Sequence, residues 1–339
     1  MMTSLTSSSS LSPSKQSLRG ASRCARSGVV VLAASAVVLS ACDIAPERAP
    51  DPTLAILGTY ALADAEALQA KRPDLAAIAQ RQADAFFGEA ERLCGTDSSG
   101  TVIASCAPVR PSQEEISQLG KNISGEPEAI MANAATRIVD NSAALEKSSM
   151  PLVVRLYAED VMLGGQQPVL DSSFELSDQA DVLSAKDALS YVYSVLYGLT
   201  VAEAYAEPGL KEQIAASIGE HREVAADMTE VLQKAPGLSA VDIPVEAAGY
   251  EFTEFPTPVD SGTALSATEL AHTNEVLMWF TQAAEADSPA WRRYALQQSG
   301  RATLASVPYV DARGTRPWEA SFVQYEIPAA TAAAEPAAE

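Results

Sequence analysis

Apolar residues recur every three or four positions over most of this chain, which is the spacing of an amphipathic helix. The pattern predicts a helix over residues 53–71 and, after a break at Pro73 and Asp74, a second helix that ends near Leu93. Because the connection is short, we expect these helices to form an antiparallel hairpin. We find no segment with the strict alternation of a half-buried strand, so the predicted fold class is all-α.

Three shorter helices are predicted after the hairpin. Ser112 and Glu115 have the spacing of a capping box, which marks the start of a short helix. The apolar spacing then predicts helices over residues 126–146 and 151–162. A run of glycine, glutamine and proline interrupts the pattern directly afterwards and is typical of a boundary. We therefore expect an N-terminal helical region over residues 53–165.

The second half of the chain has longer helical segments. Two helical hairpins connected by one long crossover would have the connectivity of an antiparallel ferritin-like four-helix bundle, which we expect over residues 175–307. The spacing places its helices from residue 177 or 184 to 206, at 208–232, at 266–286 and at 288–304, with the crossover at 235–263.

Aromatic residues are frequent in two of the segments outside these helices. Tyr250, Phe252 and Phe255 predict that the crossover packs along the bundle. The tail, residues 308–339, has two interpretations: its first part packs back on the bundle or docks another envelope protein. Its final Ala/Pro/Glu-rich residues are typical of disorder. The aromatic residues of the tail are Tyr309, Trp318, Phe322 and Tyr325.

The first 41 residues have the composition of a secretory signal. Four basic and no acidic residues precede an uncharged run from Val29 to Ala41, which is too short for a transmembrane helix. The run ends in Leu39-Ser40-Ala41-Cys42, which resembles the lipobox of bacterial lipoproteins. We expect cleavage before Cys42, a diacylglycerol group on its sulfur, and a Pro-rich tether over residues 42–52. The alternative is an ordinary secretory signal followed by an accidental cysteine.

The charge of the chain restricts its partners. The sequence has 23 basic and 44 acidic side chains, and loss of the four leader cations leaves 19 basic residues and a net charge of −25 after Ala41. Such a surface repels phosphate backbones and anionic lipid headgroups. Nucleic acid is therefore excluded as an expected partner, and attachment to the membrane depends on the acyl chains.

The cysteines agree with export. Cys24 lies in the leader, and Cys94 and Cys106 flank a turn-rich stretch in the remaining chain. In an oxidising envelope the simplest arrangement is a disulfide between Cys94 and Cys106 that closes this loop. A metal pair is the alternative, although no histidine lies nearby.

Several motifs of the second half are similar to those of one known family: residues 188–193, Glu220-His221-Arg222, residues 250–252 with 258–260, and residues 295–305. They resemble the ferritin-like domain of unknown function found in actinobacterial lipoproteins, over about residues 184–307. The resemblance implies a four-helix fold and an envelope location, but no activity, because none is assigned to the family. This chain departs from it at Asp187 and Ser190, where members often have Glu-His.

Candidate metal ligands are few. A di-iron bundle needs a carboxylate from each of two helices and a Glu-x-x-His pair from each of the other two. This chain has one such pair, Glu269 and His272, and Glu269 is also explained as the capping partner of Ser266. We therefore expect no metal and no other cofactor. Glu230 and Glu275 are further carboxylates that could act as ligands.

Glu203 and His221 fall on the apolar faces of neighbouring predicted helices. They are interpreted either as a hydrogen-bonded core pair or as the remnant of a ligand site, because an unpaired buried charge is costly. The sequence predicts a lipoprotein on the outer face of the cytoplasmic membrane with a non-catalytic binding or scaffolding role. The alternative is a ferritin-like metal or redox protein that uses Glu203, His221, Glu269 and His272.

Overall fold

The computed structural model describes residues 48–97, 99–171, 173–251 and 256–312. The predicted leader, Cys42, and the aromatic residues Phe252, Phe255 and Trp318 lie outside them, as do Phe322, Tyr325 and the end of the tail. The described part is all-helical, as predicted, and holds nine α-helices. They are α1 (Pro52–Leu68), α2 (Pro73–Cys94), α3 (Gln113–Asn122), α4 (Pro127–Asn141), α5 (Met150–Gly164), α6 (Gln179–Tyr205), α7 (Pro208–Lys234), α8 (Ser261–Glu285) and α9 (Pro289–Ala312).

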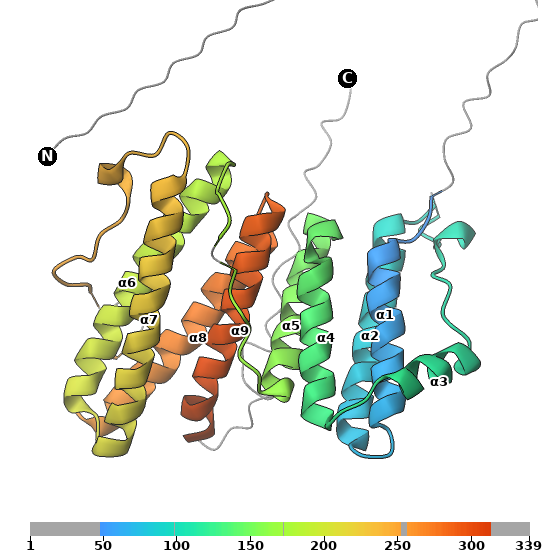
Figure 1. Ribbon diagram of the computed structural model, residues 1–339, viewed down its shortest axis with the longest axis horizontal. Helices are drawn as coiled ribbons and strands as arrows, with labels where there is room; N and C mark the ends of the chain where they lie inside the picture. The colour runs from blue at the N-terminus through green and yellow to red at the C-terminus, as the bar shows by residue number, and fades with distance from the viewer. Residues whose placement is uncertain (1–47, 98, 172, 252–255, 313–339) are drawn as a thin grey trace, which may run out of the picture. The chain divides into compact units, whose positions relative to one another are not determined.

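The helices pack mainly with their sequence neighbours. Helices α1 and α2 form the predicted hairpin, and α3 lies across it (Figure 1). Further hairpins are α4 with α5, α6 with α7, and α8 with α9, while α8 also contacts α6 and α5. One cluster of buried apolar side chains extends from α1 and α2 through α4 and α5 into α6–α9. The core is therefore continuous across the predicted boundary near residue 165.

Local capping explains where several helices begin. Ser112 and Glu115 form the predicted capping box of α3. The expected start of α8 was wrong: Asp260 and Thr263 form the capping box there, and Ser266 lies inside the helix. The prediction that Ser266 and Glu269 cap this helix was therefore wrong. An aspartate at the N-cap accepts a backbone hydrogen bond strongly, which fixes the helix start upstream of the serine.

The Gly164-Gly165 pair serves both packing and termination. A Cβ atom on Gly164 would lie 2.6 Å from the backbone nitrogen of Ala132, so glycine allows α5 to approach α4 closely. Gly165 has φ +61° and ends α5 in the left-handed conformation that glycine adopts without strain. The following connector runs along α9, where the Gln297 side chain donates to the Val169 carbonyl at 2.7 Å.

Helix α9 continues beyond its predicted end. It passes Leu304 and includes Pro308, although proline removes a helical hydrogen bond. Tyr309 and Val310 in this extension are buried. Packing of the extension against the core offsets the cost of the proline, so the first residues of the predicted tail are part of the helical body.

Candidate functional site

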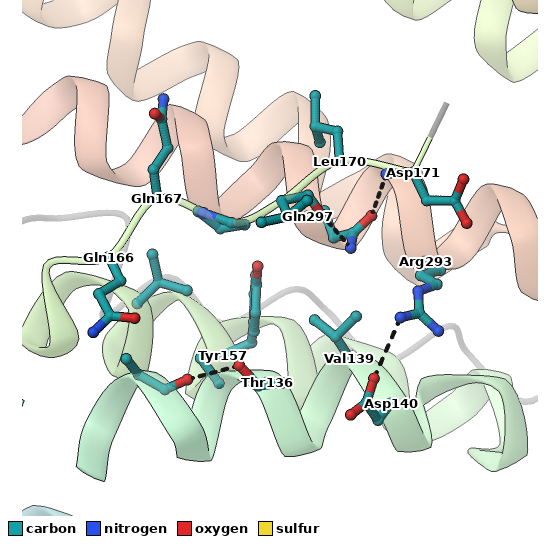
Figure 2. A pocket seen from close by; sticks show the side chains of 15 residues that line it. Thr136, Val139, Asp140, Tyr157, Gln166, Gln167, Leu170, Asp171, Arg293 and Gln297 are labelled. Atoms are coloured by element: carbon teal, nitrogen blue, oxygen red, sulfur yellow. Dashed lines mark hydrogen bonds and ion pairs between the residues drawn. The ribbon is translucent and has the colours of Figure 1, made fainter. Parts of the chain in front are cut away.

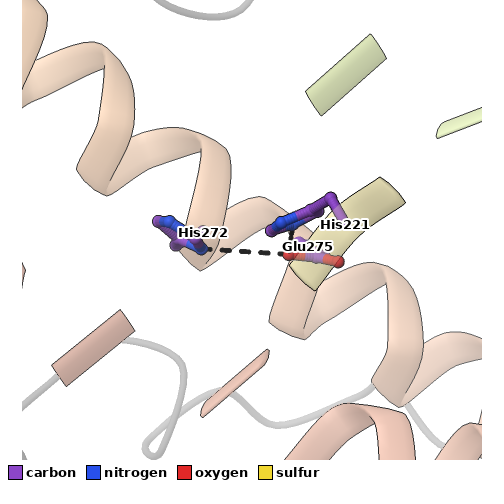
Figure 3. Close-up of side chains that lie close together, drawn as sticks. All are labelled: His221, His272 and Glu275. Carbon is purple, nitrogen blue, oxygen red and sulfur yellow. Dashed lines mark hydrogen bonds and ion pairs between the residues drawn. The ribbon is translucent and has the colours of Figure 1, made fainter. Parts of the chain in front are cut away.

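Two histidines and a glutamate meet in the core where α7 faces α8. His272 and Glu275 are three residues apart on α8, a spacing that places them on one face, and His221 approaches from α7 (Figure 3). The Nε2 atom of His221 lies 2.8 Å from a Glu275 carboxylate oxygen, Oε2. The Nδ1 atom of His272 lies 3.9 Å from the same oxygen. We call these three residues the His–Glu cluster.

The other polar atom of each side chain is held by a neighbour. The second ring nitrogen of His221, Nδ1, lies 2.7 Å from the Ser217 carbonyl oxygen, one helical turn earlier. The Nε2 atom of His272 lies 3.0 Å from the Ser217 hydroxyl. Trp279 donates its indole N–H to the second oxygen of Glu275 at 3.3 Å. The remaining atoms, Nε2 of His221, Nδ1 of His272 and Oε2 of Glu275, therefore face one another.

The cluster is almost completely removed from solvent. His272 is fully buried, and the exposed fractions of His221 and Glu275 are both 4%. Burial lowers the pKa of His272 to about 3, an effect that the neighbouring His221 increases. Burial also opposes charge on His221 and Glu275, but their ion pair and hydrogen bond outweigh it, raising the pKa of His221 and lowering that of Glu275. A charged His221–Glu275 pair thus lies beside a neutral His272.

A tyrosine ring and a small cavity also border the cluster. The Tyr309 ring stacks on His272 at 4.8 Å between centroids and 11° between planes. A cavity of about 20 Å³ touches His221 and Glu275 and is bordered by Glu220 and Arg301. This is room for about one water molecule. Because Glu220 is exposed, the cavity leads from the cluster towards the surface.

Only part of this cluster matches the predicted ligand set. The structure brings His221 and His272 together, but Glu203 and Glu269 are half-buried and not members of the cluster. His221 pairs with Glu275 instead of Glu203. The roles of Ser217, Trp279 and Tyr309 were not predicted. The sequence feature that could have revealed the cluster is the three-residue spacing of His272 and Glu275 on an otherwise apolar helix face.

The two cysteines of the N-terminal half form a disulfide. Their Cα atoms are 5.4 Å apart, and the bond joins the end of α2 to the short 3₁₀ turn Ala104–Cys106. Both side chains are buried. The disulfide closes the loop that the sequence predicted and leaves neither Cys94 nor Cys106 free to bind a metal.

Three aspartates form a second acidic group, but Asp181 already has a structural role. Its two carboxylate oxygens accept the backbone N–H groups of Asp287 at 2.9 Å and Ser288 at 2.8 Å. These bonds hold the turn between α8 and α9 against the start of α6. The other two members are Asp178 and Asp287. Asp178 caps α6 by accepting a hydrogen bond from the backbone N–H of Ala180 at 2.8 Å. The side chain of Asp287 pairs with Lys147 at 2.6 Å, so each of the three carboxylates already has a structural partner.

A larger pocket, not predicted from the sequence, lies between α4, α5, the connector after α5, and α9 (Figure 2). Its volume is about 350 Å³, within the range of small-molecule sites. Asp140 and Arg293 form an exposed ion pair at 3.3 Å on its rim. The pocket is lined by Ala132, Ala135, Thr136, Val139, Asp140, Tyr157, Val161, the connector residues 166–171, Arg293 and Gln297.

Tyr157 is the most buried polar residue of this lining. Its exposed fraction is 1%, and its hydroxyl has no hydrogen-bond partner among the described residues. A Cβ atom on Gly300 would lie 2.7 Å from that hydroxyl, so glycine there makes room for it. Burial raises the pKa of Tyr157, whereas hydrogen bonds from Ser173 lower the pKa of Asp171. Both pKa values are thus displaced further from neutral pH, whereas a typical general acid or base has a pKa close to it.

No protein-family model, curated protein or solved structure matches this chain. Among the described helices, none combines the length and apolar character needed to span a membrane.

Proposed function

We propose that this chain is a membrane-anchored envelope lipoprotein whose helical body binds a small polar molecule without chemical conversion. The sequence Leu39-Ser40-Ala41-Cys42 after an uncharged run supports the anchor. The pocket between α4, α5 and α9 supports the binding role and is the observation that carries it. Helices α6–α9 are assigned to a ferritin-like four-helix unit on their order, with two hairpins and one long crossover.

The chemistry of the pocket lining favours binding over catalysis. A polar ligand would find the amides of Gln166 and Gln167 and the charges of Asp140 and Arg293. Preformed concave sites with a few polar groups are typical of small-molecule recognition. Since the pKa values of Tyr157 and Asp171 are both displaced away from neutrality, neither is suited to proton transfer near pH 7.

The anchor is tested by replacing the lipidated cysteine. We expect Cys42→Ser to leave the leader uncleaved or to release the processed protein from membranes, because serine has no sulfur to accept the diacylglycerol group. Fractionation of cells followed by immunoblotting measures this. Cys24→Ser is the matched control, since that cysteine lies in the leader, and it should leave attachment unchanged. A processed Cys42→Ser protein that stays on membranes would contradict the anchor.

The binding role is tested by closing the pocket from its exposed side. Thr136 lines the pocket and is exposed, so Thr136→Trp should fill the opening without disturbing the core. Asn133→Trp on the same helix, exposed and outside the lining, is the control. The probes are free amino acids, hexoses and nucleosides. A bound probe at 100 times its dissociation constant should stabilise the control by about 2.7 kcal/mol.

The readout of this pocket test is thermal unfolding of each variant with and without probe. We expect at least one probe class to raise the unfolding temperature of the wild type and of Asn133→Trp, and to leave that of Thr136→Trp unchanged. The binding role fails if none of these probes has an effect, or if Thr136→Trp responds as the control does.

A further inference from the structure

We infer that the His–Glu cluster is a mononuclear binding site for a divalent transition metal of the zinc class. The ligand atoms would be Nε2 of His221, Nδ1 of His272 and Oε2 of Glu275, with a water molecule as fourth ligand. One ligand atom from each of the three residues lies within 4.8 Å of the other two. The inference is independent of the pocket proposed above, because it uses different residues.

The separations of these atoms fit a tetrahedral ion. Zinc bonds of about 2.1 Å require ligand atoms about 3.4 Å apart. The distances from the Glu275 oxygen to the two imidazole nitrogens, 2.8 Å and 3.9 Å, lie on either side of that value. Small side-chain movements would therefore equalise them. The shorter of the two distances is that of the His221–Glu275 ion pair, which binding of the metal would replace.

The unpaired nitrogen of His272 points independently to a ligand. This histidine is fully buried, and its Nδ1 atom has no hydrogen-bond partner among the described residues. A buried polar atom without a partner is costly, and few such atoms occur in native structures. Since its Nε2 atom lies 3.0 Å from the Ser217 hydroxyl, the unpaired Nδ1 atom is the one that faces Glu275, which is where a cation would be bound.

The hydrogen bonds that hold the three proposed ligand side chains are of the kind found at metal sites. Metal-binding histidines usually engage their other nitrogen with a carbonyl, carboxylate or hydroxyl group, which fixes the ring and its tautomer. Here Ser217 serves both rings, through its carbonyl oxygen for His221 and its hydroxyl for His272. Trp279 holds the other oxygen of Glu275.

The space around the cluster favours a four-coordinate ion over a non-haem iron centre. Two histidines, one carboxylate and one water are a known zinc ligand set, whereas an iron facial triad with the same residues keeps several open positions. The adjoining cavity of about 20 Å³ touches His221 and Glu275 and holds about one water. Glu220 and Arg301 on its border mark the path by which the ion would enter.

Metal titration of the full chain in detergent tests this inference. After treatment with a chelator and its removal, we expect the wild type to bind one Zn²⁺ per chain, and Co²⁺ in the same site to give the visible absorption of a four-coordinate complex. Glu275→Gln and His272→Gln should lower zinc affinity by about 100-fold or more. Glu269→Gln and Glu203→Gln, which change carboxylates outside the cluster, are matched controls and should bind as the wild type does.

X-ray absorption of the zinc-loaded wild type provides a test that needs no variant to fold. We expect two imidazole nitrogens in the first coordination shell. The inference is overturned if the wild type binds no stoichiometric zinc, if folded Glu275→Gln or His272→Gln retains wild-type affinity, or if the shell contains carboxylate and water oxygens alone, as on an acidic surface.

Discussion

Arg292→Ala is expected to lower the free energy of unfolding by about 3–5 kcal/mol. The exposed fraction of Arg292 is only 6%, and its guanidinium donates to backbone carbonyls from two distant parts of the chain. One nitrogen, Nη1, bonds to Ser142 at 3.2 Å and Leu145 at 2.8 Å, and the other, Nη2, bonds to Ala286 at 3.3 Å. Alanine would remove this donor from the buried carbonyls of Leu145 and Ala286, leave Ser142 with only the Leu145 N–H, and create a cavity.

Arg293→Ala is the matched control for this loss. The neighbouring arginine makes an ion pair with Asp140 at 3.3 Å, and both side chains are about half exposed. Exposed pairs of this kind contribute about 0–1 kcal/mol, so the control should change stability little. Urea unfolding followed by circular dichroism measures both variants. A loss of less than about 1 kcal/mol in Arg292→Ala would show that these carbonyls find other donors.

The second large effect is a pH-dependent loss of stability caused by Asp64. This carboxyl is 1% exposed, pairs with Arg137, and has one oxygen without a hydrogen-bond partner among the described residues. Burial raises its pKa from 3.8 to about 6, although Arg137 opposes the shift. Asp160 beside it is also buried, and its pKa is raised by burial, by Glu159 and by Asp64.

The direction of the effect follows from proton binding. Between about pH 4 and pH 6 the folded protein holds a proton on Asp64 that the unfolded chain has released. The contribution of Asp64 is therefore fully present below about pH 4 and is lost as the pH rises through about 6. The difference of about two pKa units corresponds to about 3 kcal/mol.

Comparison with Asp64→Asn isolates this contribution, because asparagine has the same shape and does not titrate. We expect the unfolding free energy of the wild type, relative to Asp64→Asn, to fall by about 3 kcal/mol between pH 4 and pH 7.5. Asp140→Asn, which changes an exposed carboxylate on α4, is the matched control. A difference that stays constant, or that grows with pH, would mean that Asp64 is ionised throughout.

Local patterns in the sequence predicted most of the fold. The hairpin of α1 and α2, the capping box at Ser112, and α6 and α7 depend on contacts between residues close in the chain, which periodicity records. The start of α8 was missed because two capping patterns lie a few residues apart, and only the geometry at Asp260 decides between them. The extension of α9 past Pro308 was missed because burial of Tyr309 overrides the local signal of the proline.

The candidate sites depend on long-range packing, which spacing does not encode. His221 was identified as a core residue, but the rotation of α7 against α8 gives it Glu275, not Glu203, as its partner. The pocket is built from four segments, including the connector that the sequence indicated only as a boundary. Spacing along one helix finds pairs such as His272 and Glu275, whereas a site assembled from several helices needs their relative positions.

Mass spectrometry of the native protein, extracted from its own membranes, tests the proposed envelope location most directly. We predict that the N-terminal peptide begins at Cys42 and carries a diacylglycerol group on its sulfur. A chain that retains residues 1–41, or a mature terminus with an unmodified thiol, would contradict the account.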